Sequence, residues 1–457
     1  MKITLEEVAE IVGGQLVGAN ADVDSVCSDS RSLKEGDLFF ALKGQNFNGE
    51  VFVERAFESG ACGAVVSALQ EDLPGAQILV DDVAIAFGAL ARYKRSQHSA
   101  KVIAITGSCG KTTVKGMLRS ILPLAGKTHA THANFNNHIG VPLTIFSCPS
   151  DADYMVVEAG TSTPGEIGYL TQLIDPDVAA VINVHPAHIK GFGSLEAIAS
   201  EKSRIYTFGE RQATMIVNNS LIKYPDVLDK CENRDVVLFG MYSEPALSSA
   251  SKEIKATEVA STENGGTRFS LNIDGNAYGV LLNVPGQHQV ENALAAAACA
   301  SAVGVEPSII VEGLGHFSGE KGRMQTLPYR KGQIIDDSYN ANPASMRAAI
   351  DLLAQKTRSL LVLGDMGELG AGADRIHREV GEYAAKNGVD QLVCIGAFAD
   401  DYCDGFGEKS KKFLLIDELI AYLSEQLVGD TTVLIKGSRF MKMERVVDGL
   451  ISIEGSV

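Results

Sequence analysis

The chain has 457 residues, enough for about three domains that each bury a core of their own. Its 40 Lys and Arg residues against 57 Asp and Glu residues give a net charge of −17, which argues against a general nucleic-acid binder. A hydrophobic content of 45% excludes global disorder, and no apolar run is long enough to span a membrane. The eight cysteines include no Cys-x-x-Cys pair, so neither a zinc site nor a disulfide framework is indicated. We therefore expect a cytoplasmic α/β enzyme without membrane insertion.

The first two thirds of the chain change from a mixed pattern to a regular alternation. The first eighty residues combine a helix over 5–12 with strand-like runs at 36–42 and 63–66, and a helical stretch follows at 84–97. Beyond it, strands are predicted over 101–106, 154–158, 178–184, 213–218 and 236–239, and helices over 112–122, 194–206 and 290–303. Such alternation predicts a mostly parallel sheet with helices on both faces.

Two features divide the rest of the chain. Residues 252–284 contain two strand runs around Asp274-Gly275, which is a strong hairpin signal and predicts an antiparallel excursion. A short polar, glycine-containing stretch at 317–322 marks a boundary, after which strands at 334–335, 360–363, 392–395 and 433–435 again alternate with helices. We predict three domains: a small N-terminal α/β domain over 1–83, a central P-loop domain over 84–316 and a Rossmann-like domain over 317–457.

The sharpest motif is Thr106-Gly107-Ser108-Cys109-Gly110-Lys111-Thr112-Thr113, which lies between a predicted strand and a predicted helix. In such a loop the backbone N–H groups cradle phosphate oxygens, the lysine reaches the outer phosphates and the threonine hydroxyl can bind Mg²⁺. The standard phosphate-loop pattern requires glycine where this chain has Ile105, so the match is one position short. The alternative is a glycine turn with an incidental lysine, and the strand–loop–helix context favours the phosphate loop.

Polar side chains follow the next two predicted strands. Glu158 ends the run Tyr154-Met155-Val156-Val157, and a carboxylate at the carboxyl end of a parallel strand faces the ligand crevice of such a sheet. It suits Mg²⁺, although a strand-end acid in solvent is an equal alternative from this residue alone. His185 and His188 follow the strand over 178–184 at the same edge. They are either turn residues or groups for metal binding and acid–base chemistry.

Three further positions are ambiguous. Lys202 lies in the predicted helix 194–206, where periodicity alone predicts a solvated surface lysine. The run Asp336-Asp337-Ser338-Tyr339-Asn340-Ala341-Asn342-Pro343 is either a helix cap or a polar edge for a ribose or a substrate amine. In Asp29-Ser30-Arg31, the arginine either holds a phosphate or pairs with Asp29.

Taken together, these motifs resemble the Mur ligase family over nearly the whole chain. The family's loop is Thr-Gly-x-x-Gly-Lys-Thr, which is short in the same way. Further matching strings are Asn134-Phe135-Asn136-Asn137-His138-Ile139-Gly140-Val141-Pro142, the run 187–194, Asp336 to Asn342, the run 363–370 and Lys436-Gly437-Ser438-Arg439. The resemblance implies a UDP-substrate-binding domain (1–83), an ATP-binding domain (84–316) and a ligase domain (317–457). It also implies an ATP- and Mg²⁺-dependent ligase of peptidoglycan precursor synthesis that joins D-alanyl-D-alanine to UDP-N-acetylmuramoyl-tripeptide through an acyl phosphate. Separately from the resemblance, we expect a monomer.

The resemblance also assigns roles to single residues. The catalytic residues it implies are Lys111, Lys202 and His188. It implies Mg²⁺ ligation by Thr112 and Glu158 and, at a second ion, by His188 and a carbamylated Lys202. Nucleotide contacts are implied for Gly107, Ser108, Cys109, Gly110, Lys111, Thr112, Thr113, Asn137, His288, Asn292, Arg323 and Asp337. Substrate contacts are implied for Asp29, Ser30, Arg31, Asn340 and Asn342.

The chain departs from the family's pattern after Glu158, where Gly160-Thr161-Ser162-Thr163 stands in place of the frequent Gly-Ala-Asn-His. Two other functions remain open at this point. One is a related ATP-dependent amide ligase similar to folylpolyglutamate synthase, against which the first domain with Asp29-Ser30-Arg31 counts. The other is a switch or binding protein that hydrolyses ATP to change shape.

Overall fold

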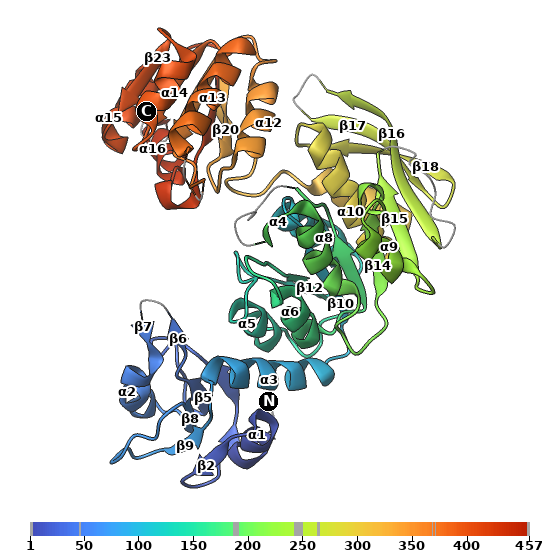
Figure 1. Ribbon diagram of the computed structural model, residues 1–457, viewed down its shortest axis with the longest axis vertical. Coiled ribbons are helices and arrows are strands. Elements are labelled where there is room, and N and C mark those ends of the chain that lie inside the picture. The colour runs from blue at the N-terminus through green and yellow to red at the C-terminus, as the bar shows by residue number, and fades with distance from the viewer. Residues whose placement is uncertain are drawn as a thin grey trace. The chain divides into compact units, whose positions relative to one another are not determined.

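The computed structural model describes residues 3–44, 47–185, 192–241, 250–262, 266–367, 369–370 and 372–454. Over this part the chain is a mixed α/β protein whose main sheets are largely parallel, as predicted (Figure 1). Its residues form two compact units, the first made of Met1–Thr257, Leu271–Tyr278 and Glu291–Gly313, the second of Glu258–Ser270, Gly279–Val290 and Leu314–Val457. Among the described residues, no helix has the length and apolar character needed to cross a membrane.

The N-terminal part of the first unit is built on a five-stranded sheet. Its strands are, in spatial order, β2 (Gln15–Val17), β9 (Ala76–Leu79), β8 (Gly63–Val66), β5 (Asp37–Phe40) and β4 (Ser25–Cys27). Within this sheet β2 pairs antiparallel with β9, and the remaining neighbours are parallel. Short antiparallel pairs join β1 (Ile3–Thr4) to β3 (Asp22–Val23) and β6 (Lys43–Gly44) to β7 (Phe47–Asn48).

Three helices accompany this sheet: α1 (Leu5–Val12), α2 (Val53–Glu58) and α3 (Val83–Ser96). Helix α1 has the predicted bounds because Thr4 and Glu7 form a capping box at its start and Gly13 ends it in the left-handed conformation. Strand β5 is buried on both faces. Leu38 and Phe40 belong to one apolar cluster and Phe39 to another, as expected for a sheet covered on both sides.

The central sheet has nine strands. Their spatial order is β11 (Thr128–Ala130), β12 (Tyr154–Glu158), β10 (Lys101–Thr106), β13 (Val178–Val181), β14 (Thr214–Asn218), β15 (Val236–Gly240), β16 (Lys252–Ser261), β17 (Thr267–Ile273) and β18 (Asn276–Leu282). From β11 to β16 all neighbours are parallel. The turn between β17 and β18 is Asp274-Gly275, both with positive φ (49° and 80°), which confirms the predicted hairpin turn.

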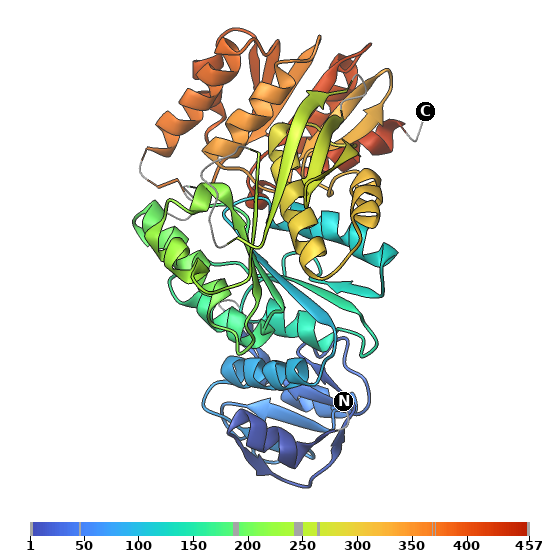
Figure 2. The same ribbon diagram turned by 90° about the vertical axis from the view of Figure 1, so that its right-hand side faces the viewer.

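Helices lie on both faces of the parallel part of this sheet (Figures 1 and 2). They are α4 (Lys111–Ile121), α5 (Gly140–Phe146), α6 (Glu166–Ile174), α8 (Leu195–Ser203), α9 (Pro225–Cys231), α10 (Gln287–Ala302) and α11 (Pro307–His316). Strand β10 lies between β12 and β13. After β10 the chain forms β11 and β12 on one side of it, and then crosses to the other side, where it forms β13 and β14. At such a switch point the loops after neighbouring strands meet and form a ligand crevice.

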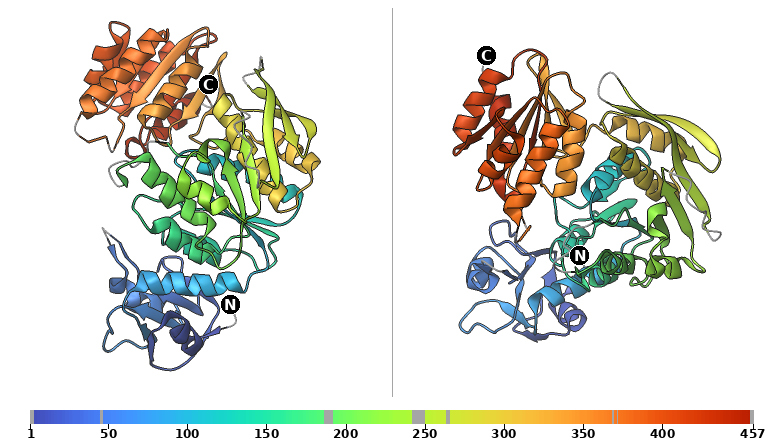
Figure 3. Two further views of the ribbon diagram at one scale, coloured as in Figure 1. Left: turned by 45° about the vertical axis from the view of Figure 1, so that its right-hand side comes forward. Right: turned by 45° about the horizontal axis from the view of Figure 1, so that its top comes forward.

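The C-terminal part of the second unit has a six-stranded sheet with helices on both faces (Figure 3). Its order is β19 (Gln325–Tyr329), β20 (Gly332–Asp337), β24 (Thr432–Lys436), β21 (Ser359–Gly364), β22 (Gln391–Ile395) and β23 (Ser410–Phe413), and β19–β20 is its antiparallel pair. The helices are α12 (Pro343–Leu353), α13 (Ala373–Lys386), α14 (Ala399–Phe406), α15 (Ile416–Gln426) and α16 (Glu444–Glu454). Along β21, Leu361 and Leu363 enter one apolar cluster and Leu360 and Val362 the other.

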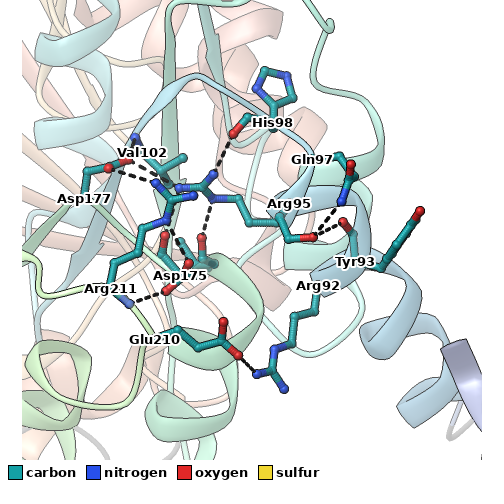
Figure 4. Close-up of polar contacts among 12 residues, drawn as sticks. Arg92, Tyr93, Arg95, Gln97, His98, Val102, Asp175, Asp177, Glu210 and Arg211 are labelled. Carbon is teal, nitrogen blue, oxygen red and sulfur yellow. Dashed lines mark hydrogen bonds and ion pairs between the residues drawn. The ribbon is translucent and has the colours of Figure 1, made fainter.

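A buried arginine anchors α3 to the central sheet of the first unit. Arg95 is 1% exposed, and its guanidinium donates to the carbonyl oxygens of Ile174 (2.8 Å), Asp175 (2.9 Å) and His98 (3.1 Å). A fourth contact joins it to the Asp177 carboxylate at 3.3 Å (Figure 4). The guanidinium therefore neutralises an acid beside β13 and satisfies the last carbonyls of α6, which have no partner within their helix.

Replacement of Arg95 by leucine is expected to lower the free energy of unfolding by about 3 kcal/mol, because buried carbonyl acceptors lose their donors. Denaturant unfolding of the full chain measures this change. The matched control is Arg92→Leu in the same helix, since Arg92 is half-exposed and pairs with exposed Glu210. That variant should change stability by less than about 0.5 kcal/mol. Equal losses in the two variants would contradict the role of Arg95.

Candidate active site

The loop between β10 and α4 has the geometry of a phosphate loop. Gly110 precedes α4 with φ 81°, a conformation that favours glycine. A Cβ atom at this position would also lie 2.3 Å from Oδ1 of Asn292, so α10 packs directly against the loop. Nζ of Lys111 donates to the carbonyl oxygen of Gly107 at 2.8 Å. The loop, Lys111 and Asn292 therefore lie together in one place.

Asn183, just after β13, braces this loop and was not predicted. Its side chain accepts from the N–H of Cys109 at 3.0 Å and donates to the Cys109 carbonyl at 3.1 Å, while its backbone carbonyl accepts from the N–H of Ser108 at 3.2 Å. The Ser108 hydroxyl and the backbone of His185 are also bonded to each other, at 3.0 and 3.1 Å. The residues that follow β13 therefore fix the conformation of the phosphate loop at Ser108 and Cys109.

Glu158 is a buried carboxylate, not an acid in solvent. It is 2% exposed at the end of β12. The Thr112 hydroxyl donates to it at 3.1 Å, Nδ2 of Asn136 donates at 2.8 Å, and Nζ of Lys115 lies 3.4 Å away. Lys115 is itself 2% exposed and donates to the carbonyl oxygen of Ala133 at 2.7 Å. The Thr112 hydroxyl and the Glu158 carboxylate form a pair of hard oxygen donors beside the phosphate loop.

A cavity of about 250 Å³ opens beside Lys111. One side is formed by Lys111 and the run Asn136 to His138, and the other by Gly160, Thr161, Ser162, Glu166, Tyr169 and Leu170. Asn137 lines the cavity and also accepts from the N–H of Gly140 at 2.8 Å, which holds the start of α5. The cavity therefore places a cation against a wall of hydroxyl and carboxylate groups.

Lys202 is not a surface lysine. Its side chain in α8 is buried, with only 4% exposed. Burial and repulsion from Lys111 lower the pKa of Lys202 to about 7, although Cys109 and Glu201 act in the opposite direction. The alternative based on periodicity is wrong because both Glu201 and Lys202 point inward from the last turn of α8.

The two histidines have different outcomes. His185 is exposed after β13 and contacts the loop through its backbone, as described above. His188, predicted as a catalytic residue and metal ligand, lies outside the described residues. Among the residues that are described, no cluster of three or more His, Cys, Asp or Glu side chains is arranged to hold a metal ion. A cation at this site would be coordinated by few protein atoms and by oxygen atoms of phosphate groups and water, as is common for Mg²⁺.

In the second unit, the predicted polar run is an ordered network. Asp337 pairs with Nζ of buried Lys436 at 2.5 Å, and Nζ also donates to the Asn340 carbonyl at 2.9 Å. Asp336 is fully buried and accepts from the N–H of Gly322 at 3.0 Å. Burial raises the pKa of Asp336 despite these hydrogen bonds. The two acids of this run therefore have different roles. Asp337 is paired with a lysine, whereas Asp336 accepts a hydrogen bond from the backbone.

The other predicted residues of the second unit lie around Tyr339 or at helix starts. The Arg323 guanidinium stacks over the Tyr339 ring at 4.1 Å, and Arg439 lies 5.5 Å from the same ring. Asn342 caps α12 by accepting from the N–H of Ser345 at 2.9 Å, which supports the helix-cap alternative for this residue. His288 is exposed in the first turn of α10.

Asp29 and Arg31 pair with each other. Nη2 of Arg31 lies 2.7 Å from Oδ2 of Asp29, and the pair is largely exposed. Hydrogen bonds from the Arg31 side chain and backbone lower the pKa of Asp29 to about 2. Ser30 lies between them, partly buried. This arrangement shows the pairing alternative, and it leaves the guanidinium of Arg31 facing solvent.

Comparison with known proteins identifies the class. Two family models match the chain: the Mur ligase middle domain over residues 105–300 and the Mur ligase glutamate ligase domain over residues 322–439. The chain belongs to the Mur ligase family, whose members are ATP-using ligases. The matched segments contain the phosphate loop, Glu158, Lys202 and the network around Asp337.

Named relatives narrow the comparison. The chain is 38% identical, over 98% of both proteins, to the UDP-N-acetylmuramoyl-tripeptide–D-alanyl-D-alanine ligase of Escherichia coli. Among solved structures, it is similar to the UDP-N-acetylmuramoylalanyl-D-glutamyl-2,6-diaminopimelate–D-alanyl-D-alanyl ligase of Acinetobacter baumannii, with a TM-score of 0.88, 33% identity and 99% of each chain covered. The MurF ligase of Thermotoga maritima in complex with ADP matches with a TM-score of 0.81 and 26% identity, covering 94% of this chain and 97% of that one.

Sequence reasoning missed several residues of the site. Asn136 and His138 lie within the string Asn134 to Pro142, but no role was predicted for them. Lys115 follows Lys111 at the spacing of one helical turn, and this spacing could have indicated that both lysines face the site. Asn183 and Glu201 carried no local signal, because their roles depend on contacts with segments far along the chain. Glu166 was also missed, although its hydrogen-bond donors lie in the turn directly before it.

If Lys111 stabilises the transferring phosphoryl group, Lys111→Ala is expected to lower turnover by at least about 10²-fold, because the variant loses that charge. Release of ADP from ATP in the presence of substrates measures the change. Lys127→Ala is the control, since Lys127 is an exposed lysine paired with Asp151, and its turnover should be unchanged. A folded Lys111→Ala protein with near-normal turnover would contradict the assignment.

Proposed function

We propose that the chain joins D-alanyl-D-alanine to UDP-N-acetylmuramoyl-tripeptide, with conversion of ATP to ADP and phosphate, in the synthesis of peptidoglycan precursors. The observation that carries the proposal is the cavity that begins at Lys111 of the phosphate loop and ends at the wall around Glu166. It can hold a carboxylate next to the terminal phosphate of a bound nucleotide. The Escherichia coli relative aligns with almost the full chain, and its name gives the same two substrates, which supports the proposal.

The chemistry requires activation of a carboxylate. An oxygen of the tripeptide carboxylate attacks the γ-phosphorus, the bond to the β-phosphate oxygen breaks, and ADP leaves. The amine of the dipeptide then attacks the carbonyl carbon of the acyl phosphate, loses a proton and expels phosphate. Both reactants of the first step are anions, so Lys111 and the loop N–H groups stabilise the charge that gathers between them.

The residues present fit a magnesium ion. Thr112 and Glu158 offer neighbouring oxygen atoms 3.1 Å apart at the phosphate loop, and oxygen is the ligand atom that Mg²⁺ prefers. We propose these two as its protein ligands, and when bound the ion would supply positive charge to the phosphate groups. Lys115 lies on the same face of α4 as Thr112, approaches the same carboxylate oxygen of Glu158 and neutralises its charge.

We propose that Lys202 acts as a carbamate. A neutral amine adds CO₂ and loses a proton, which replaces a cation by an anion with two oxygen atoms. The burial of the side chain and its closeness to Lys111 disfavour an ammonium group at this position. The carbamate would hold a second magnesium ion together with His188, as the family resemblance implies.

If Lys202 is carbamylated, activity is expected to fall in CO₂-depleted buffer and to recover when bicarbonate is added. Lys202→Ala should lose at least about 10²-fold in turnover, and Lys202→Arg equally, because guanidinium forms no carbamate. Mass spectrometry of the native protein under CO₂, with ¹³C-bicarbonate as label, reads the modification without an activity assay. Full activity of Lys202→Arg, or no bicarbonate effect and no label, would contradict the carbamate.

The remaining assignments are proposals on the same basis. We propose His288, Asn292, Arg323 and Asp337 for the nucleotide, Asp29, Ser30 and Arg31 for the uridine diphosphate, and Asn340 and Asn342 for the peptide. The contact of Asn292 with Gly110 supports the first group. The self-paired Asp29 and Arg31 support a substrate role only through the exposed guanidinium. We further propose that the chain acts in the cytoplasm as a monomer.

Measurement of ADP release with each substrate omitted in turn tests the function. We expect release to require both UDP-N-acetylmuramoyl-tripeptide and D-alanyl-D-alanine, with Lys111→Ala as the inactive control. A nucleotide switch would release ADP without either substrate. A ligase of the folylpolyglutamate type would require a folate and glutamate instead, and either result would overturn the proposal.

A further inference from the structure

A buried glutamate next to Lys202 is not used by the chemistry described so far. Glu201 in α8 is 3% exposed, and its two carboxylate oxygens face the start of α6. Oε2 accepts from the N–H of Gly165 and Oε1 from the N–H of Ile167, both at 2.9 Å. Nε of Arg204 lies 3.3 Å from Oε2. Every oxygen of this buried anion thus has a donor.

These contacts replace a missing helix cap. The first N–H groups of a helix have no partner within it, and the residue before the helix usually supplies an oxygen. In α6 that residue is Gly165, with φ 96° and no side chain to do so. Glu201 takes its place from 36 residues further along the chain, and its negative charge suits the positive end of the helix dipole.

The helix start held by Glu201 is one wall of the cavity beside Lys111. Glu166, the first residue of α6, lines the cavity and accepts from the N–H groups of Ser162 (2.6 Å) and Thr163 (2.9 Å) and from the Thr161 hydroxyl (3.0 Å). Burial raises the pKa of Glu166, but these hydrogen bonds lower it by more, so the group stays anionic. The position of the 161–163 turn therefore follows from that of Glu166.

We infer that Glu201 is a positioning residue that fixes the cavity wall formed by Thr161, Ser162 and Glu166 for the peptide-carboxylate substrate. The inference rests on the proposed function, in which this cavity receives the carboxylate end of UDP-N-acetylmuramoyl-tripeptide. Glu201 acts through α6 and touches neither substrate. Its loss weakens binding of that one substrate, whereas the nucleotide, held by the phosphate loop, binds as before.

The other end of α6 provides a matched comparison. Arg95 bonds the carbonyl oxygens of Ile174 and Asp175, so the helix is held by a buried anion at its start and a buried cation at its end. Nine residues of helix separate these ends by about 13 Å, and Arg95 does not line the cavity. A change at Arg95 loosens the same helix without moving the wall.

The test compares Glu201→Gln, Glu201→Ala and Arg95→Leu in the full chain by steady-state kinetics with each substrate varied, alongside thermal unfolding. Glutamine keeps the shape of the side chain but has one oxygen for two N–H donors. We expect both Glu201 variants to raise KM for UDP-N-acetylmuramoyl-tripeptide by at least about tenfold, with KM for ATP within about twofold of the parent. Arg95→Leu should lower thermal stability and leave both KM values near those of the parent.

A direct reading uses calorimetric titration of UDP-N-acetylmuramoyl-tripeptide into each variant without ATP, at a temperature well below unfolding. If Glu201→Ala is too unstable to measure, Glu201→Gln still tests the inference, because glutamine has nearly the same volume as glutamate. Added bicarbonate should not restore Glu201→Gln, which separates its effect from one through Lys202. Unchanged affinity for the tripeptide substrate, or equal rises of both KM values, would overturn the inference. If the parent protein itself does not use this substrate, the proposed function fails instead.

Discussion

The buried charge of Glu158 is the constraint on which the rest of the site depends. A carboxylate 2% exposed is tolerated only when donors surround it, and here they come from α4 and from the segment before α5. Thr112 and Lys115 bring the helix that follows the phosphate loop, and Asn136 brings one wall of the cavity. One acid at the end of β12 therefore sets the relative positions of the phosphate loop, a pair of oxygen donors and one wall of the cavity beside Lys111.

A second buried charge extends this arrangement to the opposite wall. Glu201 and Lys202 are neighbours in α8 but face different partners: the carboxylate faces the start of α6, and the amine lies near Lys111. Because one short helix carries both, the cavity wall and the lysine cannot move independently. Arg95 ties the far end of α6 to α3 and thereby joins the N-terminal sheet to the central one. Charge, rather than apolar packing alone, connects the parts of the first unit.

Much of the fold was predictable because its signals are local. For several elements, the residues that determine the structure are neighbours in the sequence. Examples are the apolar run of β10, the capping box of α1 and the Asp274-Gly275 turn. The phosphate loop was found for the same reason. Helix α6 was missed because Gly165 offers no cap, and the residue that caps it lies 36 positions away. The burial of Lys202 was missed because α8 buries polar residues, so its periodicity shows no apolar face. The domain boundaries and the roles of Asn340 and Asn342 in binding stay predictions.

The central claim is that the chain activates a peptide carboxylate with the phosphoryl group of ATP at the cavity beside Lys111. Isotope transfer tests it most directly. UDP-N-acetylmuramoyl-tripeptide labelled with ¹⁸O in both oxygens of its reacting carboxylate is incubated with ATP, D-alanyl-D-alanine and the protein, and the released phosphate is analysed by mass spectrometry. An acyl phosphate predicts one ¹⁸O atom in each phosphate released and one in the new amide. Phosphate without label, alongside ADP formation, would show that ATP is hydrolysed by water and would contradict the account.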